Sequence, residues 1–114
     1  MSEIRKELGR ISRVCFGFGG YQDCQIGMFV CLEGKGWGVN ASIEGGWSIK
    51  IEHTKQCKWT DEDRDSHYAD MVRHIQVIMS KAKVKDIADL LHKPVECEFN
   101  GQVLVNWRIL EEVL

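Results

Sequence analysis

The chain has 114 residues, of which 44% are hydrophobic and 28% are charged, and its formal net charge at pH 7 is −2. This length is enough for one domain with a core of its own. The slight acidity argues against a protein that holds nucleic acid or an anionic membrane by electrostatics. No apolar run approaches the ~20 residues that cross a bilayer, so we expect no membrane-spanning segment.

The start of the chain and its cysteines indicate a cytoplasmic protein. The opening MSEIRKELGR alternates charges and lacks the apolar run of a signal peptide. The five cysteines have no disulfide-framework spacing. Cys15, Cys31 and Cys97 fall in strand-like segments, where a reduced cysteine behaves as a small hydrophobe. We therefore expect reduced thiols and a cytoplasmic location.

The first half of the chain predicts four antiparallel strands. Apolar residues alternate from 14 to 18, whereas residues 26–32 are apolar on both faces, which is typical of a central strand. Alternation returns over 37–43 and again over 47–51. These four segments are expected to form a meander.

The loops of this meander follow from the burial pattern. A one-residue slip in strand pairing turns every side chain to the other face of the sheet. A four-residue loop places Leu32 opposite Trp37, and a three-residue loop at 44–46 places Ile43 opposite Trp47. With these loops the apolar residues of the strands share one face.

The middle of the chain predicts one long and one short helix. Thr60 and Asp63 have the spacing of a capping box at a helix start. Acidic residues lead the helix and lysines close it, as the helix dipole favours. The short helix is expected over 84–91, before Pro94. The long helix carries a stripe of apolar residues at the 3–4 spacing of a buried face, namely Tyr68, Met71, Val72, Ile75, Ile78, Met79 and Ala82.

The end of the chain predicts a hairpin. Asn100-Gly101 is typical of a two-residue turn, but a three-residue loop at 100–102 gives a better burial pattern. It pairs Phe99 with Val103 and Cys97 with Val105. The predicted fold is a single α+β domain, in which an antiparallel sheet, made of the four-strand meander and this C-terminal hairpin, packs against one long and one short helix.

The stretch FGFGGYQDCQIG, residues 16–27, has three interpretations. A phosphate loop needs a helix N-terminus and usually a lysine, whereas a strand follows here. The aromatic spacing partly matches an RNA-recognition motif, but its basic and glycine positions are occupied by Val14 and Cys15. The third interpretation is a strand that bends at its glycines and turns tightly. A loop at the tip of such a rigid hairpin is a common place for binding groups.

This reasoning gives a set of candidate binding residues. Trp37 lies among small neighbours, which would leave one face of its ring uncovered, and tryptophan and tyrosine are frequent in binding hot spots. Core packing explains Tyr21 and Trp37 about as well. The candidate partner- or ligand-binding residues are Gly19, Gly20, Tyr21, Gln22, Asp23 and Trp37.

The patterns that would indicate a metal site or a catalytic site are weaker than those of the candidate binding residues. The acids that start at Asp61 imitate a calcium loop but lack its glycine and its final glutamate. His53, Cys57, His67 and His74 are candidate zinc ligands without an anchoring CxxC or HxxxH pair. Cys57 lies between lysines and is the candidate nucleophile of an enzyme. We expect no cofactor and no catalytic site.

Several motifs together resemble small proteins encoded by bacteriophages and prophages. They are Phe-Gly-Phe-Gly-Gly-Tyr-Gln at 16–22, Gly-Trp-Gly-Val at 36–39, Lys-Trp-Thr at 58–60 and Lys-Pro-Val-Glu at 93–96. The resemblance implies a protein made in a bacterial host, with a role in infection or in countering host defence. It implies no activity and no catalytic residue.

Three functional hypotheses follow. The first is a non-enzymatic phage or prophage binding protein that occupies a host protein through the glycine-aromatic hairpin. The second is a protein that sequesters a nucleotide or another small ligand. The third is an enzyme based on Cys57 or the histidines. A flat exposed aromatic patch would favour the first, a deep pocket with converging polar groups the second. An exposed edge strand would also permit a homodimer.

Overall fold

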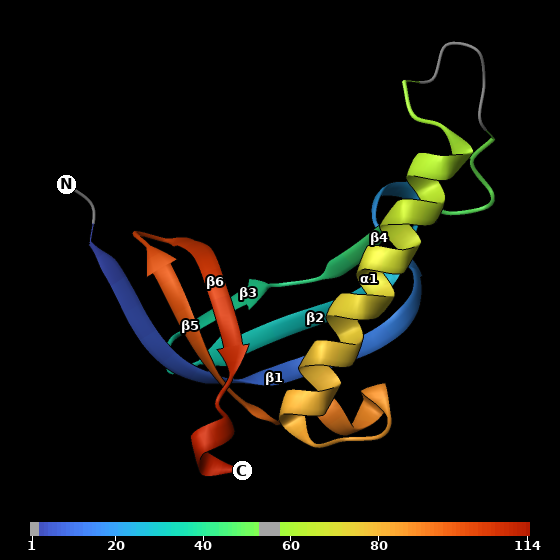
Figure 1. Ribbon diagram of the computed structural model, residues 1–114. Coiled ribbons are helices and arrows are strands. Elements are labelled where there is room, and N and C mark those ends of the chain that lie inside the picture. Colours follow the sequence, from blue (N-terminus) through green and yellow to red (C-terminus); the bar gives the residue numbers. More distant parts are fainter. Residues whose placement is uncertain (1–2, 53–57) are drawn as a thin grey trace.

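The computed structural model describes residues 3–52 and 58–114 and shows an α+β fold in which a six-stranded antiparallel sheet packs against one α-helix (Figure 1). Alternating apolar residues form the strands and the 3–4 stripe forms the helix, as the sequence predicts. The elements are β1 (Ile4–Gly19), η1 (Tyr21–Asp23), β2 (Gln25–Gly34), β3 (Trp37–Asn40), β4 (Ile43–Trp47), α1 (Asp61–Ala82), η2 (Ile87–Leu90), β5 (Pro94–Asn100), β6 (Val103–Ile109) and η3 (Glu111–Val113).

Strand β1 joins the two halves of the sheet. Its residues from Ile4 to Arg10 pair with β5, and those from Gly9 to Gly19 pair with β2. A β-bulge at Ser12 adds one residue to β1. Because a bulge bends its strand and increases the local twist, β1 sweeps in an arc across the molecule (Figure 1). The strand order is β3-β2-β1-β5-β6, and β4 lies beside β3 on the same edge of β2.

The hairpin predicted at 44–46 does not form. Strands β3 and β4 both pair with β2, with Met28 opposite Ile43. Between them the N–H of Ala41 donates to the carbonyl of Val30 at 2.8 Å, and the hydroxyl of Ser42 accepts the N–H of Val30 at 3.1 Å. These bonds carry the chain onward along β2 instead of turning it back. The expected fourth strand over 47–51 is therefore replaced by the last residue of β4 and a turn.

The loop predicted at 33–36 is also shorter than expected. The turn consists of residues 35–36 only, so Gly34 pairs with Trp37 and Leu32 pairs with Val39. Gly36 has a φ of 82°, a left-handed conformation that glycine adopts without steric cost.

The C-terminal hairpin turns through two residues, 101–102, and Asn100 pairs with Val103. The three-residue loop predicted from the burial pattern is therefore wrong. A β-bulge in β6 takes up the extra residue instead, so that Cys97 pairs with Trp107. The bulge restores the inward–outward alternation of side chains within β6. The sequence pattern alone does not indicate where such a bulge occurs.

The helix confirms its predicted start. The hydroxyl of Thr60 accepts the N–H of Asp63 at 3.1 Å, and the carboxylate of Asp63 accepts the N–H of Thr60 at 2.8 Å, which completes the capping box. The helix ends at Lys83, which has a left-handed φ of 58°. The short helix predicted over 84–91 is a single 3₁₀ turn, η2, whose first N–H groups are capped by Asp86.

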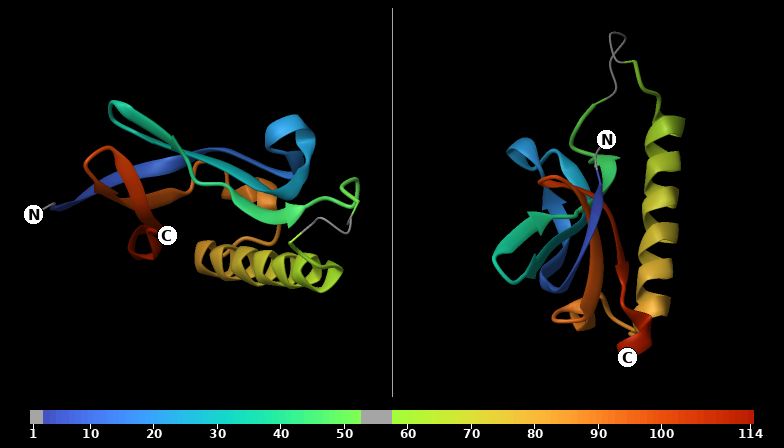
Figure 2. Two further views of the ribbon diagram at one scale, coloured as in Figure 1. Left: turned by 90° about the horizontal axis from the view of Figure 1, so that it is seen from above. Right: turned by 90° about the vertical axis from the view of Figure 1, so that its left-hand side faces the viewer.

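The core lies between α1 and one face of the sheet (Figure 2). The helix buries one side on the sheet and lies closest to β4. The fully buried hydrophobic residues of the core are Ile11, Met28, Val30, Leu32, Leu90, Val95 and Cys97, and α1 contributes Met71, Ile75, Ile78 and Ala82.

Candidate functional site

The predicted binding loop lies at the tip of the β1–β2 hairpin and has an unusual backbone. Gly20, Gln22 and Asp23 all have left-handed φ values, of 75°, 54° and 55°. For residues with a side chain this conformation is uncommon and costs free energy. Gly19 is required by packing, since a Cβ atom there would overlap the ring of Phe29. The side chain of Tyr21 lies outside the described part of the structure.

Three of the candidate residues line a cavity of about 310 Å³ on the sheet face away from α1. Val14 and Val30 point to the core, so the residues next to them, Cys15 and Phe29, point to the opposite face. Gly19, Gly20 and Asp23 form part of the wall, and the remaining lining residues are Arg13, Cys15, Phe18, Phe29, Cys31, Asn40 and Ser42. The hairpin tip therefore covers a small hollow of mixed polarity.

Trp37 does not join this group. It pairs with Gly34 at the far end of β2, nine residues from Gln25, which is about 30 Å along a strand. Its ring lies against the backbone of Gly9 and Gly34. It also makes an edge-to-face contact with Phe99, with ring centroids 5.2 Å apart. The predicted patch of Tyr21 and Trp37 is therefore not formed, and Trp37 packs against the core.

A second surface at the same end of the molecule is strongly apolar. Phe16 and Phe18 are about half exposed and Ile49 is 79% exposed. Phe18, Ile26, Ser48, Ile49, Tyr68 and Met71 surround a hollow of about 250 Å³. Val72 follows Tyr68 by four residues and so lies on the same side of α1, where it is 48% exposed. We call the residues Phe16, Phe18, Ile49, Tyr68 and Val72 the apolar strip.

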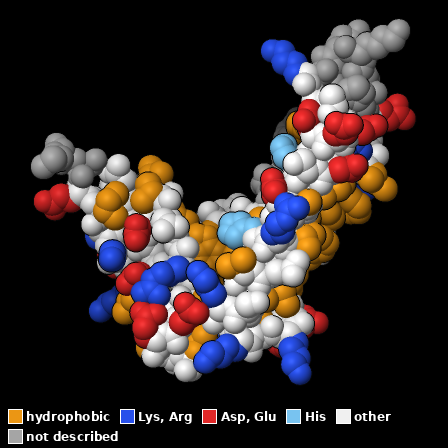
Figure 3. All heavy atoms as spheres, viewed as in Figure 1, with side chains coloured by type: hydrophobic (Ala, Val, Ile, Leu, Met, Phe, Trp, Pro, Cys, Tyr) orange, Lys and Arg blue, Asp and Glu red, His pale blue; other side chains and the backbone are white. Residues whose placement is uncertain are grey.

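The apolar strip follows one flank of α1. Hydrophobic side chains gather along this flank in the space-filling view (Figure 3). The opposite flank is mixed in character, because His67, Asp70 and His74 line a separate hollow there together with Ile43 and Met71. The two flanks of one helix thus differ in character, and only the flank toward β1 carries the strip.

Specific contacts hold the strip in place. The hydroxyl of Tyr68 donates to the carbonyl of Trp47 at 2.6 Å, and the N–H of Ser48 donates to the carbonyl of Cys24 at 2.8 Å. The ammonium of Lys50 lies 4.2 Å from the centre of the Phe18 ring, within the range of a cation–π interaction. These contacts tie Tyr68, the main chain of Ser48 next to Ile49, and the ring of Phe18 to their neighbours.

The strand beside the strip has an open edge. Strand β5 pairs with β1 only as far as Arg10, and the main chain of Ile11 bonds to residues 92 and 93. Beyond the bulge at Ser12, the described part of the chain places a strand on one side of β1 only, namely β2, while the 3₁₀ turn η2 also packs against β1. This open edge covers residues 13–19 and lies next to Phe16 and Phe18.

The direction of the main-chain groups at this edge follows from Val30. Both its N–H and its carbonyl bond away from β1, to residues 42 and 41. Val14 is opposite Val30, so the two form a non-hydrogen-bonded pair, and the N–H and carbonyl of Val14 point to the open edge. The N–H and carbonyl groups of Phe16 and Phe18, two and four residues further along β1, point to the open edge for the same reason. Within residues 3–52 and 58–114, no hydrogen bond reaches these groups.

The structure describes only some of the metal and nucleophile candidates. His67 and His74 share the mixed flank of α1, but the described residues contain no group of three side chains that could hold a metal ion. His53 and Cys57 lie outside the described residues. Cys97 is buried, and burial together with the nearby charge of Glu96 raises the pKa of its thiol to about 11, which makes it a poor nucleophile at neutral pH.

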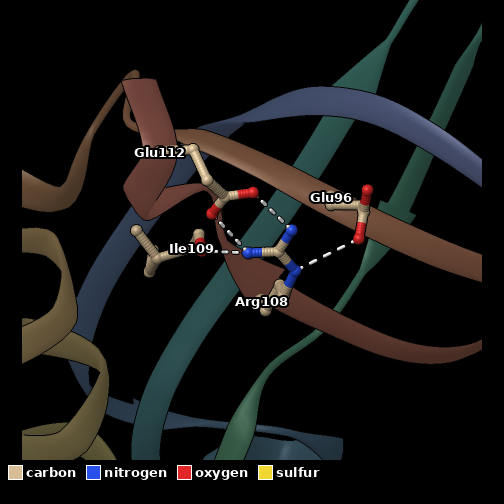
Figure 4. A network of polar contacts seen from close by, with 4 residues as sticks. All are labelled: Glu96, Arg108, Ile109 and Glu112. Carbon is tan, nitrogen blue, oxygen red and sulfur yellow. Dashed lines mark hydrogen bonds and ion pairs between the residues drawn. The ribbon is translucent and has the colours of Figure 1, made fainter. Parts of the chain in front are cut away.

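An ion-pair network near the C-terminus joins Arg108 to two glutamates (Figure 4). The guanidinium of Arg108 donates two parallel hydrogen bonds of 2.8 Å to the carboxylate of Glu112 and one of 3.1 Å to Glu96. The hydrogen bonds from Arg108 lower the pKa of Glu112 to about 2. This network joins η3 to the β5–β6 hairpin and leaves no free group for chemistry.

Comparison with protein-family models, with curated proteins and with solved structures yields no match to this chain. No helix among residues 3–52 and 58–114 is long and apolar enough to cross a membrane.

Sequence reasoning identified the hairpin tip but missed the apolar strip. Phe16 and Phe18 belong to the glycine-aromatic stretch, yet Ile49 was assigned to a strand and Tyr68 to the buried stripe. Strand β1 is longer than its ten-residue partner β2. A difference in strand length of this kind is the signal that could have indicated an unpaired edge.

Proposed function

We propose that this protein is a small non-enzymatic binding protein that holds another protein on the apolar strip. The observation that carries the proposal is the exposure of Phe18 and Ile49 at an apolar hollow, with Phe16 exposed two residues before Phe18 on β1. A contiguous apolar surface of this kind marks interaction sites in proteins. Aromatic side chains with a fixed conformation give large contact area at a low cost in conformational entropy.

A macromolecular partner fits this surface better than a small ligand. The hollow of about 250 Å³ lies below the usual range of small-molecule sites, and Ser48 and Tyr68 already use polar groups within the fold. Few polar groups remain to orient a ligand there. The surrounding strip, by contrast, is suited to an apolar anchor residue from a protein.

The resemblance to phage and prophage proteins supports a partner from the bacterial host. In that setting the protein would act in the host cytoplasm by occupying a host protein, in host takeover or in countering defence. The formal net charge of the chain, −2, does not favour binding to nucleic acid.

A small-ligand binder is the second candidate, and one observation favours it. The cavity of about 310 Å³ under the hairpin tip collects Gly19, Gly20 and Asp23, together with Arg13. It offers one acidic side chain, one cationic side chain and two aromatic rings, from Phe18 and Phe29. Extra mass in native mass spectrometry that disappears with Asp23→Ala would support this reading over the first.

Site-specific photocrosslinking tests the leading proposal. Ile49 is replaced with the photoreactive residue p-benzoylphenylalanine in protein made in bacterial cells. The control carries the same residue in place of Val103, which is 64% exposed at the far end of the sheet. We expect a discrete adduct with a second protein from position 49 and not from position 103. Equal labelling from both positions, or none from position 49, would overturn the proposal.

A further inference from the structure

We propose that two copies of this chain join along the open edge of β1, antiparallel and centred on Phe16, so that their apolar strips merge into one groove. This inference rests on the proposed function, because it takes the apolar strip as the binding surface. The partner that binds the open edge is a second copy of the chain.

The open edge has the features of a pairing strand. Val14, Phe16 and Phe18 direct N–H and carbonyl groups outward, and no described residue bonds to them. Unpaired strand edges readily accept another strand, and proteins usually protect them by breaks, bulges or charges. The other edges of the described sheet have such protection. Residues 4–8 of β1, which pair with β5 only, carry the charged side chains of Arg5, Lys6 and Glu7. The outer edge beyond β2 is split between β3 and β4, and the edge strand β6 contains a bulge.

Self-pairing satisfies every outward group in one register. With Phe16 opposite Phe16 of the second copy, Val14 of each copy lies opposite Phe18 of the other. All three residues then form hydrogen-bonded pairs, because their main chains already point outward. The arrangement has twofold symmetry, as the commonest dimers do.

The side chains at the ends of the edge are also complementary. Arg13 starts the open edge, and Lys93 lies beside Ile11 just before it. Asp23 lies at the other end, in the hairpin tip. An antiparallel partner places the basic end of one copy against the acidic end of the other. Gly17 offers no obstacle, since a Cβ atom there would meet nothing within 4 Å.

The dimer would complete the binding surface. Paired residues of antiparallel strands point to the same face of a sheet, so both apolar strips and both α1 helices lie on one side. Phe16 and Phe18 of the two copies then form a floor two strands wide, about 10 Å. The α1 flanks that carry Tyr68 and Val72 form its walls. Each copy alone provides only half of this groove.

Light scattering with size-exclusion chromatography is the first test. We expect the unmodified chain to show twice its 13.1 kDa mass. Phe16→Pro removes an outward N–H without removing a bond to β2, and a proline is tolerated at such an edge position. It should weaken the dimer by more than about 30-fold, because each dimer loses two main-chain hydrogen bonds. Phe16→Leu keeps the N–H and should remain dimeric. A monomer at 100 µM for the unmodified chain would overturn the inference.

A disulfide trap tests the register and does not depend on the folding of the proline variant. In the proposed pairing, Gly17 lies opposite Cys15 of the second copy. G17C treated with copper phenanthroline should therefore give a covalent dimer, which Cys15→Ser should abolish. V103C, with its thiol at the far end of the sheet, is the control and should give none that depends on Cys15. A G17C dimer that survives Cys15→Ser would overturn the register.

The two proposals fail separately. A monomeric chain that still crosslinks a second protein from position 49 would overturn the dimer and leave the binding function intact. A dimer that crosslinks no other protein from position 49 would overturn the binding function and leave the edge pairing intact.

Discussion

The hydroxyl of Tyr68 donates a 2.6 Å hydrogen bond to the main-chain carbonyl of Trp47, and this bond joins α1 to the end of β4. It lies at the rim of the apolar hollow, so one contact both fixes the helix and shapes the surface. A helix residue from the predicted buried stripe thus holds the wall of the candidate site.

Tyr68→Phe should lower the free energy of unfolding by about 1 kcal/mol. The variant keeps the aromatic ring and loses one hydrogen bond to a main-chain carbonyl. Urea unfolding followed by circular dichroism measures the effect. Val72→Ala, on the same helix flank but exposed, is the comparison and should change the free energy by less. Equal stability of Tyr68→Phe and the unmodified chain would mean that the bond does not stabilise the fold.

Gly34→Ala should destabilise the fold by about 1–3 kcal/mol, because the new methyl group would overlap the ring of Trp37. Tryptophan fluorescence should shift as that ring moves from its place against Phe99. Gly17→Ala is the matched control on the open part of β1, where nothing lies within 4 Å of the new atom. We expect the control to be neutral or slightly stabilising. Similar losses in both variants would show that strand glycines matter here for another reason.

Thr60→Ala should cost about 1 kcal/mol of stability, because it removes the side-chain half of the capping box. Thr60→Ser keeps the hydroxyl and should restore most of the loss. Thermal unfolding of the three proteins in parallel gives the comparison. If the serine variant is as unstable as the alanine variant, the loss comes from packing of the threonine methyl group and not from the cap.

The Arg108–Glu112 pair should make stability depend on pH in the acid range. The pKa of Glu112 falls from an ordinary value of 4.5 to about 2 in the folded protein. A carboxylate with a lowered folded pKa contributes stability that is fully present above its unfolded pKa and is lost as the pH falls through the folded pKa. The contribution of Glu112 should therefore disappear between about pH 4.5 and pH 2.

Denaturant unfolding at pH 6 and at pH 2 tests this for the unmodified chain and for Glu112→Gln. The glutamine variant should be less stable at pH 6, and the difference should narrow at pH 2. Glu111→Gln, one residue away, is the control and should not show the same narrowing. A constant difference between the unmodified chain and Glu112→Gln at both pH values would contradict the assignment.

Local signals in the sequence predicted the helix closely. Thr60 and Asp63 bond to each other's main chain across three residues, so the geometry of the cap is contained in a short segment. The buried side of α1 likewise follows from 3–4 spacing, and Met71, Ile75, Ile78 and Ala82 are all buried. Val72, which the same spacing placed in the buried stripe, is half exposed, so the prediction is wrong at that position. Such features depend on neighbours along the chain, which is why a pattern can reveal them.

The strand registers were harder to predict. The pairing of Cys97 with Trp107 depends on a bulge in β6, and the course of 41–47 depends on bonds to Val30. Neither a bulge nor a side-chain hydrogen bond to a neighbouring strand produces a periodic pattern in the sequence. The three-residue turn would have turned Val103 and Val105 to the core, whereas the two-residue turn with the bulge leaves both exposed and places Leu104 opposite Phe99.

The sequence by itself determined the α+β class, the helix with its cap and the hairpin tip at residues 19–23, because these follow from periodicity and local hydrogen bonding. Only the tertiary structure decided that Trp37 packs on Gly9 and Gly34, that Phe18, Ile49 and Tyr68 meet around one hollow, and that β1 keeps an open edge. Each of these depends on which distant segments come into contact. The free energy of those contacts depends on both segments of each pair, so the sequence of one segment alone does not predict it.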